Sequence, residues 1–94
     1  MRDLQVAVDG RRIWQAEGSI RTDQLAEIGL SAVDGPYETL AGLTATLLER
    51  IPRPGDTVHF DGWDITVLGV NHHRADRLTL TAPAADRAEQ ESAR

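Results

Sequence analysis

The sequence predicts an α+β domain of two layers, in which a mainly antiparallel sheet is covered by two helices. Apolar residues recur with a period of two near both ends of the chain, and with a helical period over residues 39–51 between them. Glycine, proline, asparagine or aspartate stands at each change of period. Strands that flank helical segments in this way bury one face of their sheet under those helices. A length of 94 residues corresponds to a single domain.

The chain is predicted to begin with a β-hairpin. Leu4, Val6 and Val8 alternate with polar or small neighbours, and the alternation resumes over residues 12–16. The dipeptide Asp9-Gly10 between these runs is a strong signal for a two-residue hairpin turn.

A short helix is expected to follow this hairpin. Thr22 or Asp23 can cap its N-terminus, and either choice agrees with the sequence. Leu25 and Ile28 would point inward, and Gly29 is placed to end the helix in the left-handed conformation.

The main helix is predicted over residues 39–51, after a loop at residues 31–36. Thr39 is a good N-cap because its hydroxyl can accept from a free amide of the first turn. Pro52 is expected to end the helix, and Pro54-Gly55 then supplies a tight turn. The apolar face of this helix is expected to consist of Leu40, Leu43, Leu47, Leu48 and Ile51.

The second half of the domain is predicted to be a β-meander. Strands at residues 58–60 and 63–67 are joined by the turn dipeptide Asp61-Gly62. A polar turn over residues 71–76 leads to a third strand around residues 78–80. We therefore expect the domain to comprise residues 1–82, followed by a mobile charged tail at residues 83–94.

Composition excludes several classes of function. The net charge of −5 argues against nucleic acid and against direct binding to an anionic membrane surface, because both partners require a basic surface. No apolar run approaches the roughly 20 residues of a membrane helix, so no direct membrane insertion is expected. The absence of cysteine excludes disulfides and thiolate chemistry.

No catalytic or metal-binding pattern is found by spacing. His72 and His73 are adjacent and would point in different directions, while His59 lies elsewhere, so the three imidazoles are not expected to hold a metal. Nearby aspartates do not form a magnesium-binding loop. No nucleophile and base, paired carboxylates or glycine-rich phosphate loop can be recognised. We therefore expect a protein without catalytic activity.

Gly42 is unusual because it falls inside the main helix, where glycine costs about 1 kcal/mol relative to alanine. Its presence predicts that something packs closely against the helix at this point. A neighbouring strand is the favoured interpretation, and a bound ligand is the alternative.

Two motifs together carry a family resemblance. Tyr-Glu-Thr-Leu-Ala-Gly at residues 37–42, an apolar helix, and Ile-Pro-x-x-Gly-Asp at residues 51–56 occur in this order before an alternating hairpin. The combination resembles the CorC/HlyC transporter-associated domain over about residues 12–82. The residues that match the family motif are Tyr37, Glu38, Thr39, Leu40, Gly42, Pro52, Gly55 and Asp56.

For most of these residues local structure offers a sufficient explanation. Thr39 caps a helix, Pro52 ends one and Gly55 forms a turn. Tyr37 can pack its ring, and the Asp56 carboxylate can cap the turn.

The resemblance implies a non-catalytic regulatory or interaction domain. Members of the family lie on the cytoplasmic side of membrane proteins implicated in magnesium and cobalt efflux and of hemolysin-like proteins, usually after CBS modules. Those modules are the implied partners, and a homodimer through open edge strands stays an alternative. The family fold is described as similar to part of the FAD-binding PCMH-like fold. A module for an adenine or flavin nucleotide is therefore the alternative function, resting on fold analogy alone, and no other cofactor is implied.

Overall fold

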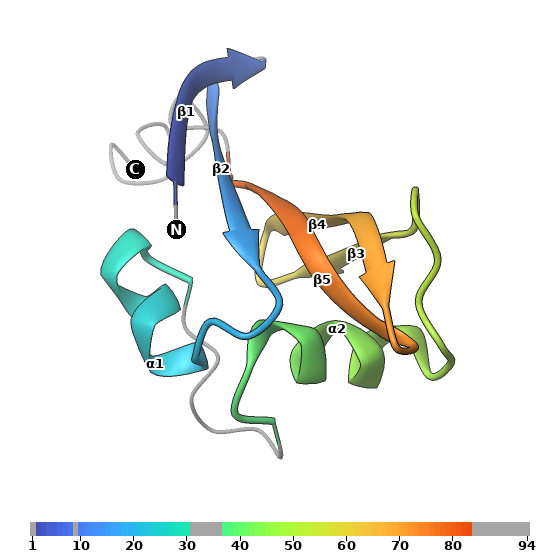
Figure 1. Cartoon of the computed structure of the whole chain (residues 1–94). Helices are drawn as coiled ribbons and strands as arrows, with labels where there is room; N and C mark the ends of the chain where they lie inside the picture. Colours follow the sequence, from blue (N-terminus) through green and yellow to red (C-terminus); the bar gives the residue numbers. More distant parts are fainter. Residues whose placement is uncertain (1, 9, 31–36, 84–94) are drawn as a thin grey trace.

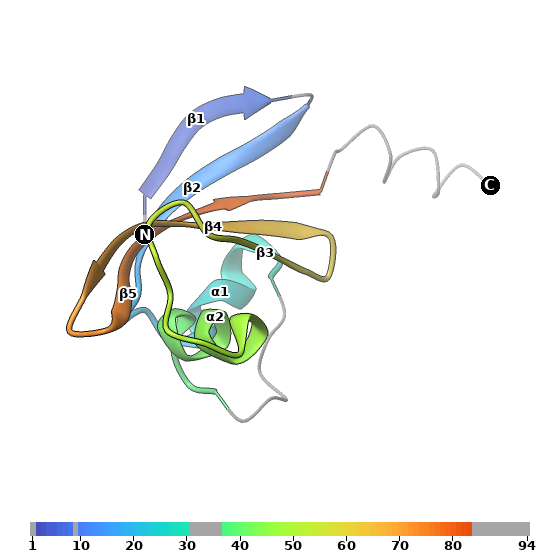
Figure 2. The same cartoon turned by 90° about the vertical axis from the view of Figure 1, so that its right-hand side faces the viewer.

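A five-stranded antiparallel sheet forms one layer of the computed structural model, and the helices form the other (Figures 1 and 2). The structure describes residues 2–8, 10–30 and 37–83. The predicted loop at residues 31–36 and nearly all of the predicted tail lie outside these residues, as does Asp9 of the first turn. The elements are β1 (Arg2–Val8), β2 (Arg11–Glu17), α1 (Thr22–Leu25), the 3-10 helix η1 (Ala26–Ile28), α2 (Leu40–Leu48), β3 (Thr57–Phe60), β4 (Trp63–Asn71) and β5 (Arg74–Thr81).

The order of strands in the sheet is β1-β2-β5-β4-β3, so the last strand of the chain lies in the middle. Trp14 of β2 pairs with Leu80 of β5, and Leu80 pairs in turn with Ile65 of β4. The inward-facing residues of three strands therefore form one row under the helices. The predicted α+β class and antiparallel two-layer architecture are confirmed.

The core lies between the central strands and the helix layer. Leu25, Leu40 and Leu43 come from the helices and meet Ile65 and Leu78 from the sheet, and all five are fully buried. Both helices cover the same face of the sheet, as Figure 2 shows from the side. The opposite face carries threonines and charged residues, which agrees with alternation along each strand.

The main helix is shorter than predicted. It ends at Leu48, and Glu49 takes up a left-handed conformation with φ 57°. This early turn buries Pro52 and leaves Ile51 57% exposed, so the prediction that Ile51 belongs to the apolar helical face is wrong. The core therefore takes up the Pro52 ring, and the Ile51 side chain stays outside. Helical periodicity cannot predict this, because it does not show where the helix ends.

Two further boundaries differ from the predictions. The turn between β4 and β5 consists of His72 and His73 alone, with φ values of 53° and 65°, and not of residues 71–76. Two successive residues of positive φ form the tight hairpin turn that matches strand twist. The N-cap of α1 is Arg21, since Thr22 is already helical and buried and its backbone amide bonds the carbonyl of Glu38 at 2.9 Å. Gly29 ends η1 with φ 94°, as expected.

Candidate functional site

The first half of the family motif builds the start of α2. Thr39 is extended, and its hydroxyl accepts from the Gly42 amide at 3.1 Å, which confirms the predicted N-cap. Leu40 is fully buried, and the Tyr37 ring packs against the core at partial exposure. The Glu38 side chain is exposed, while its carbonyl accepts from the Thr22 amide. These contacts join the start of α2 to the start of α1.

Gly42 does not face a neighbouring strand. A Cβ placed on it would lie 3.4 Å from the hydroxyl oxygen of Thr39 and 3.5 Å from the Cβ of Tyr37, both in the turn before the helix. The favoured interpretation of this glycine is therefore wrong in its choice of neighbour. The close approach occurs at Gly18, where a Cβ would lie 1.8 Å from the carbonyl oxygen of Ala75.

The second half of the motif fixes the loop between α2 and β3. Gly55 has φ 95°, and its amide donates to the carbonyl of Val67 at 2.8 Å. The Asp56 carboxylate accepts from the Arg53 amide at 2.8 Å and from the Arg50 guanidinium at 2.7 Å. The hydrogen bond from Arg50, and then that from the Arg53 amide, lower the pKa of Asp56. Asp56 thus acts as the cap of this turn.

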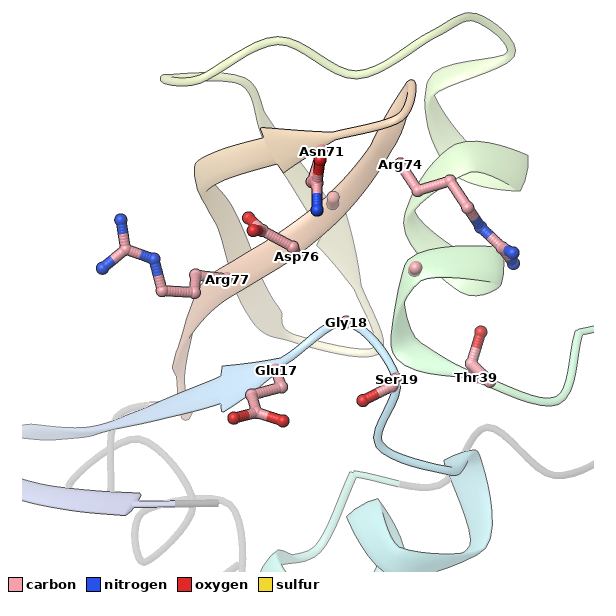
Figure 3. A pocket seen from close by; sticks show the side chains of 10 residues that line it. Glu17, Gly18, Ser19, Thr39, Asn71, Arg74, Asp76 and Arg77 are labelled. Carbon is pink, nitrogen blue, oxygen red and sulfur yellow. The ribbon is translucent and has the colours of Figure 1, made fainter.

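A hollow of about 510 Å³ lies where β2 leaves the sheet (Figure 3). Its floor consists of the small buried residues Gly18, Ala41 and Ala75. Its rim is polar and is formed by Glu17, Ser19, Thr39, Asn71, Arg74, Asp76 and Arg77. We call this site the β5 hollow. Its volume falls within the range of roughly 300–1,000 Å³ that is usual for small-molecule sites.

The amides at the N-terminus of α2, beside the β5 hollow, already have partners. The Leu40 amide donates to the carbonyl of Ile20, and the Ala41 amide donates to the carbonyl of Gly18, each at 2.9 Å. The third amide, of Gly42, is bound by the Thr39 cap. Helix amides that bind phosphate must be free to donate. The N-terminus of α2 therefore offers no free amides for the phosphate groups of a nucleotide, which was the alternative ligand.

The histidines are not gathered around an ion. In the part of the chain that the structure describes, no group of three histidine, cysteine, aspartate or glutamate residues lies close enough to hold a metal. His59 is exposed and bonds Asp64 through Nδ1 at 2.5 Å, while Arg11 bonds the other carboxylate oxygen at 2.7 Å. Burial raises the pKa of Asp64, but the hydrogen bonds from Arg11 and His59 outweigh it and leave that pKa lowered.

The β5 hollow could not have been found from the sequence. Glu17 and Asp76 are nearly sixty positions apart, and what brings them to one rim is the pairing of β2 with β5. Gly18 gave the one available signal, because a glycine at the end of a predicted strand often marks a close backbone approach. Periodicity says nothing about which strand that backbone approaches.

The fold and its motif agree with a known family. The family model of the CorC_HlyC transporter associated domain matches residues 7–84. The chain belongs to this family. The resemblance inferred from the two motifs is thereby confirmed.

Curated relatives of this CorC_HlyC domain are much longer proteins. UPF0053 protein MT1890 of Mycobacterium tuberculosis is 38% identical over 80 residues, a match that covers 71% of this chain and 18% of the relative. The polyamine export protein of Escherichia coli is 28% identical, and the match covers 82% of this chain and 18% of that protein. The chain therefore spans less than a fifth of the length of these relatives.

Solved structures show the same fold. A Mg²⁺ and Co²⁺ transporter (CorC) associated region from Neisseria meningitidis superposes with a TM-score of 0.68 at 21% identity, covering 74% of this chain and 88% of that one. A CorC_HlyC domain of a Xylella fastidiosa hemolysin, solved in complex with Mg²⁺ and Mn²⁺, gives a TM-score of 0.60 at 29% identity and covers 80% and 91% of the two chains. A transporter associated domain from a CBS domain protein of Porphyromonas gingivalis gives 0.64 at 19% identity, covering 85% and 95%.

Proposed function

We propose that this chain is a non-catalytic regulatory and interaction domain of a membrane cation transporter. It would act on the cytoplasmic side, docked on other parts of the same protein, with CBS modules as the principal partner. The observation that carries this proposal is that the chain is much shorter than its curated relatives. The match covers only 18% of a relative named as a polyamine export protein, so most of that protein is available for the transport that its name states.

The structure supports a docking role through the way it uses the family motif. Thr39 caps α2, Gly55 forms a turn, and the Asp56 carboxylate accepts a hydrogen bond from the Arg53 amide. These motif residues therefore stabilise the fold. Within the described residues, no helix is long and apolar enough to cross a membrane. Among the described residues, the outer face of the sheet carries exposed side chains such as Thr57 and Leu68, which a neighbouring domain could contact.

The transported cation is proposed from the relatives alone. Magnesium and cobalt are the ions we propose first, because a structural neighbour is described as a Mg²⁺ and Co²⁺ transporter (CorC) associated region. The name of the E. coli relative points to polyamines, which share positive charge with these ions and little else. Transport of a cation is what the two descriptions have in common.

A titration tests the docking. The purified chain is added to the CBS modules encoded in the same gene, and binding is followed by calorimetry. We expect saturable binding with a dissociation constant of about 100 μM or tighter, in the range of contacts between domains of one chain. Transport by the full-length protein is measured in parallel with and without this domain, at matched levels of protein in the membrane. Absence of binding together with unchanged transport would refute the proposal.

A further inference from the structure

The floor of the β5 hollow is built before any ligand arrives. The Gly18 amide donates to the carbonyl of Asp76 at 3.0 Å, and the Gly18 carbonyl accepts from the Ala41 amide at 2.9 Å. One residue thus joins β5 to α2 across the bottom of the hollow. The contact between Gly18 and Ala75 leaves no room for a side chain, so these backbones cannot move closer and fill the space.

The rim of the hollow carries charges of both signs. Figure 3 shows the carboxylates of Glu17 and Asp76 on the side of β2 and β5, together with the guanidinium of Arg77, whereas Arg74 and Thr39 lie on the side of α2. None of these four charged side chains makes an ion pair within the residues that the structure describes. The Thr39 hydroxyl accepts from Gly42, which leaves its hydrogen free to be donated.

These features disfavour two classes of ligand and favour a third. A phosphate group would find the amides of α2 already bound, as shown above. A bare cation would find two carboxylates but also Arg77 on the same side and Arg74 across the hollow. A ligand that carries both charges would satisfy both sides, and its apolar part could cover the alanine and glycine floor.

We propose that the β5 hollow binds a zwitterionic α-amino acid. The carboxylate faces Arg74 and the Thr39 hydroxyl, and the ammonium group faces Glu17 and Asp76. An apolar side chain lies over Gly18, Ala41 and Ala75. The amino-acid site and the docking to CBS modules are separate proposals. Binding of the amino acid is measured on the isolated chain, so the failure of one proposal can be told from the failure of the other.

Three matched compounds test the charge requirement. L-leucine carries both charges, N-acetyl-L-leucine only the carboxylate, and L-leucinamide only the ammonium group. Each is titrated into the ¹⁵N-labelled chain, and the amide resonances of Gly18, Ala41 and Ala75 are followed. We expect saturable shifts with L-leucine and binding at least about tenfold weaker with the other two, because each lacks one charge-assisted contact. Equal binding of L-leucinamide or of N-acetyl-L-leucine, or no binding of L-leucine, overturns the proposal.

Variants locate the site. Arg74→Gln and Glu17→Gln are both surface substitutions and are expected to weaken L-leucine binding about tenfold or more. Arg53→Gln is the matched control, because Arg53 is also exposed but lies in the loop before β3 and does not line the hollow. We expect the control to bind L-leucine as the unaltered chain does. Unchanged binding in Arg74→Gln and Glu17→Gln would place any amino-acid site elsewhere and refute the assignment.

Discussion

A single hydrogen atom in place of a side chain decides how closely β2 approaches β5. At Gly18 the nearest carbonyl oxygen, that of Ala75, would lie 1.8 Å from a Cβ. At Gly42 the nearest atoms would lie at 3.4 Å and beyond, which is ordinary contact. The sequence marks Gly42 as the unusual glycine, yet Gly18 is the one that packing requires.

Substitution of these glycines should therefore have opposite effects. Gly18→Ala is expected to destabilise the fold by roughly 3 kcal/mol or more, because the backbone of β5 must move. Gly42→Ala, the matched control, should be neutral or stabilise by up to about 1 kcal/mol through helix propensity. Urea unfolding followed by circular dichroism gives both values. A mild effect at Gly18, comparable with that at Gly42, would contradict the close contact.

At the scale of the element, the two ends of α2 have different origins. The N-terminus is set by a local hydrogen bond between Thr39 and Gly42, three residues apart, and was therefore predictable. The C-terminus depends on contacts with the rest of the molecule. Pro52 is buried, and the Asp56 carboxylate holds both Arg50 and the Arg53 amide, so the chain leaves the helix at Glu49.

The hydrogen bonds that the Asp56 carboxylate accepts should make the stability of the fold depend on pH. The Arg50 hydrogen bond lowers the folded-state pKa below the ordinary aspartate value of about 3.9, so the contribution is fully present above that value. It is lost as the pH falls through the lower folded-state pKa. We expect Asp56→Asn to be less stable than the unaltered chain near neutral pH, and the difference to shrink as the pH falls from about 5 to about 2.

Urea midpoints across this pH range measure the difference. Glu27→Gln is the control, because Glu27 is an exposed acid in η1 for which the structure records no hydrogen bond. It should differ little from the unaltered chain at every pH. A constant difference between Asp56→Asn and the unaltered chain at all pH values would show that the carboxylate charge does not stabilise the loop.

At the scale of the whole molecule, the last strand becomes the centre of the sheet. β5 pairs with β2 on one side and with β4 on the other, and α2 packs against it. β1 and β3 form the edges, and α1 is only four residues long. We therefore expect the last strand in the sequence to be the most stable one, and the first strand to be less stable.

Hydrogen exchange should show this order. Amides of β5 such as those of Thr79 and Leu80 are expected to exchange only on global unfolding, while amides in α1 and β1 should exchange at least about tenfold faster through local opening. Exchange followed by NMR in D₂O gives the rates residue by residue. If α1 were as protected as β5, the small helix would unfold with the core and this assignment of stability would be wrong.

The sequence by itself determined the elements whose cause is local: the alternation of both hairpins, the Thr39 cap, the left-handed Gly29, and the two motifs that identify the family. These rest on residues a few positions apart, and periodicity and capping report them directly. The tertiary structure alone decided that Ile51 is exposed while Pro52 is buried, that Gly18 and not Gly42 is the tight contact, and that Glu17 and Asp76 line one hollow. Those outcomes depend on which strands pair and which side chains the core can pack. Such long-range contacts do not appear in the periodicity of the sequence.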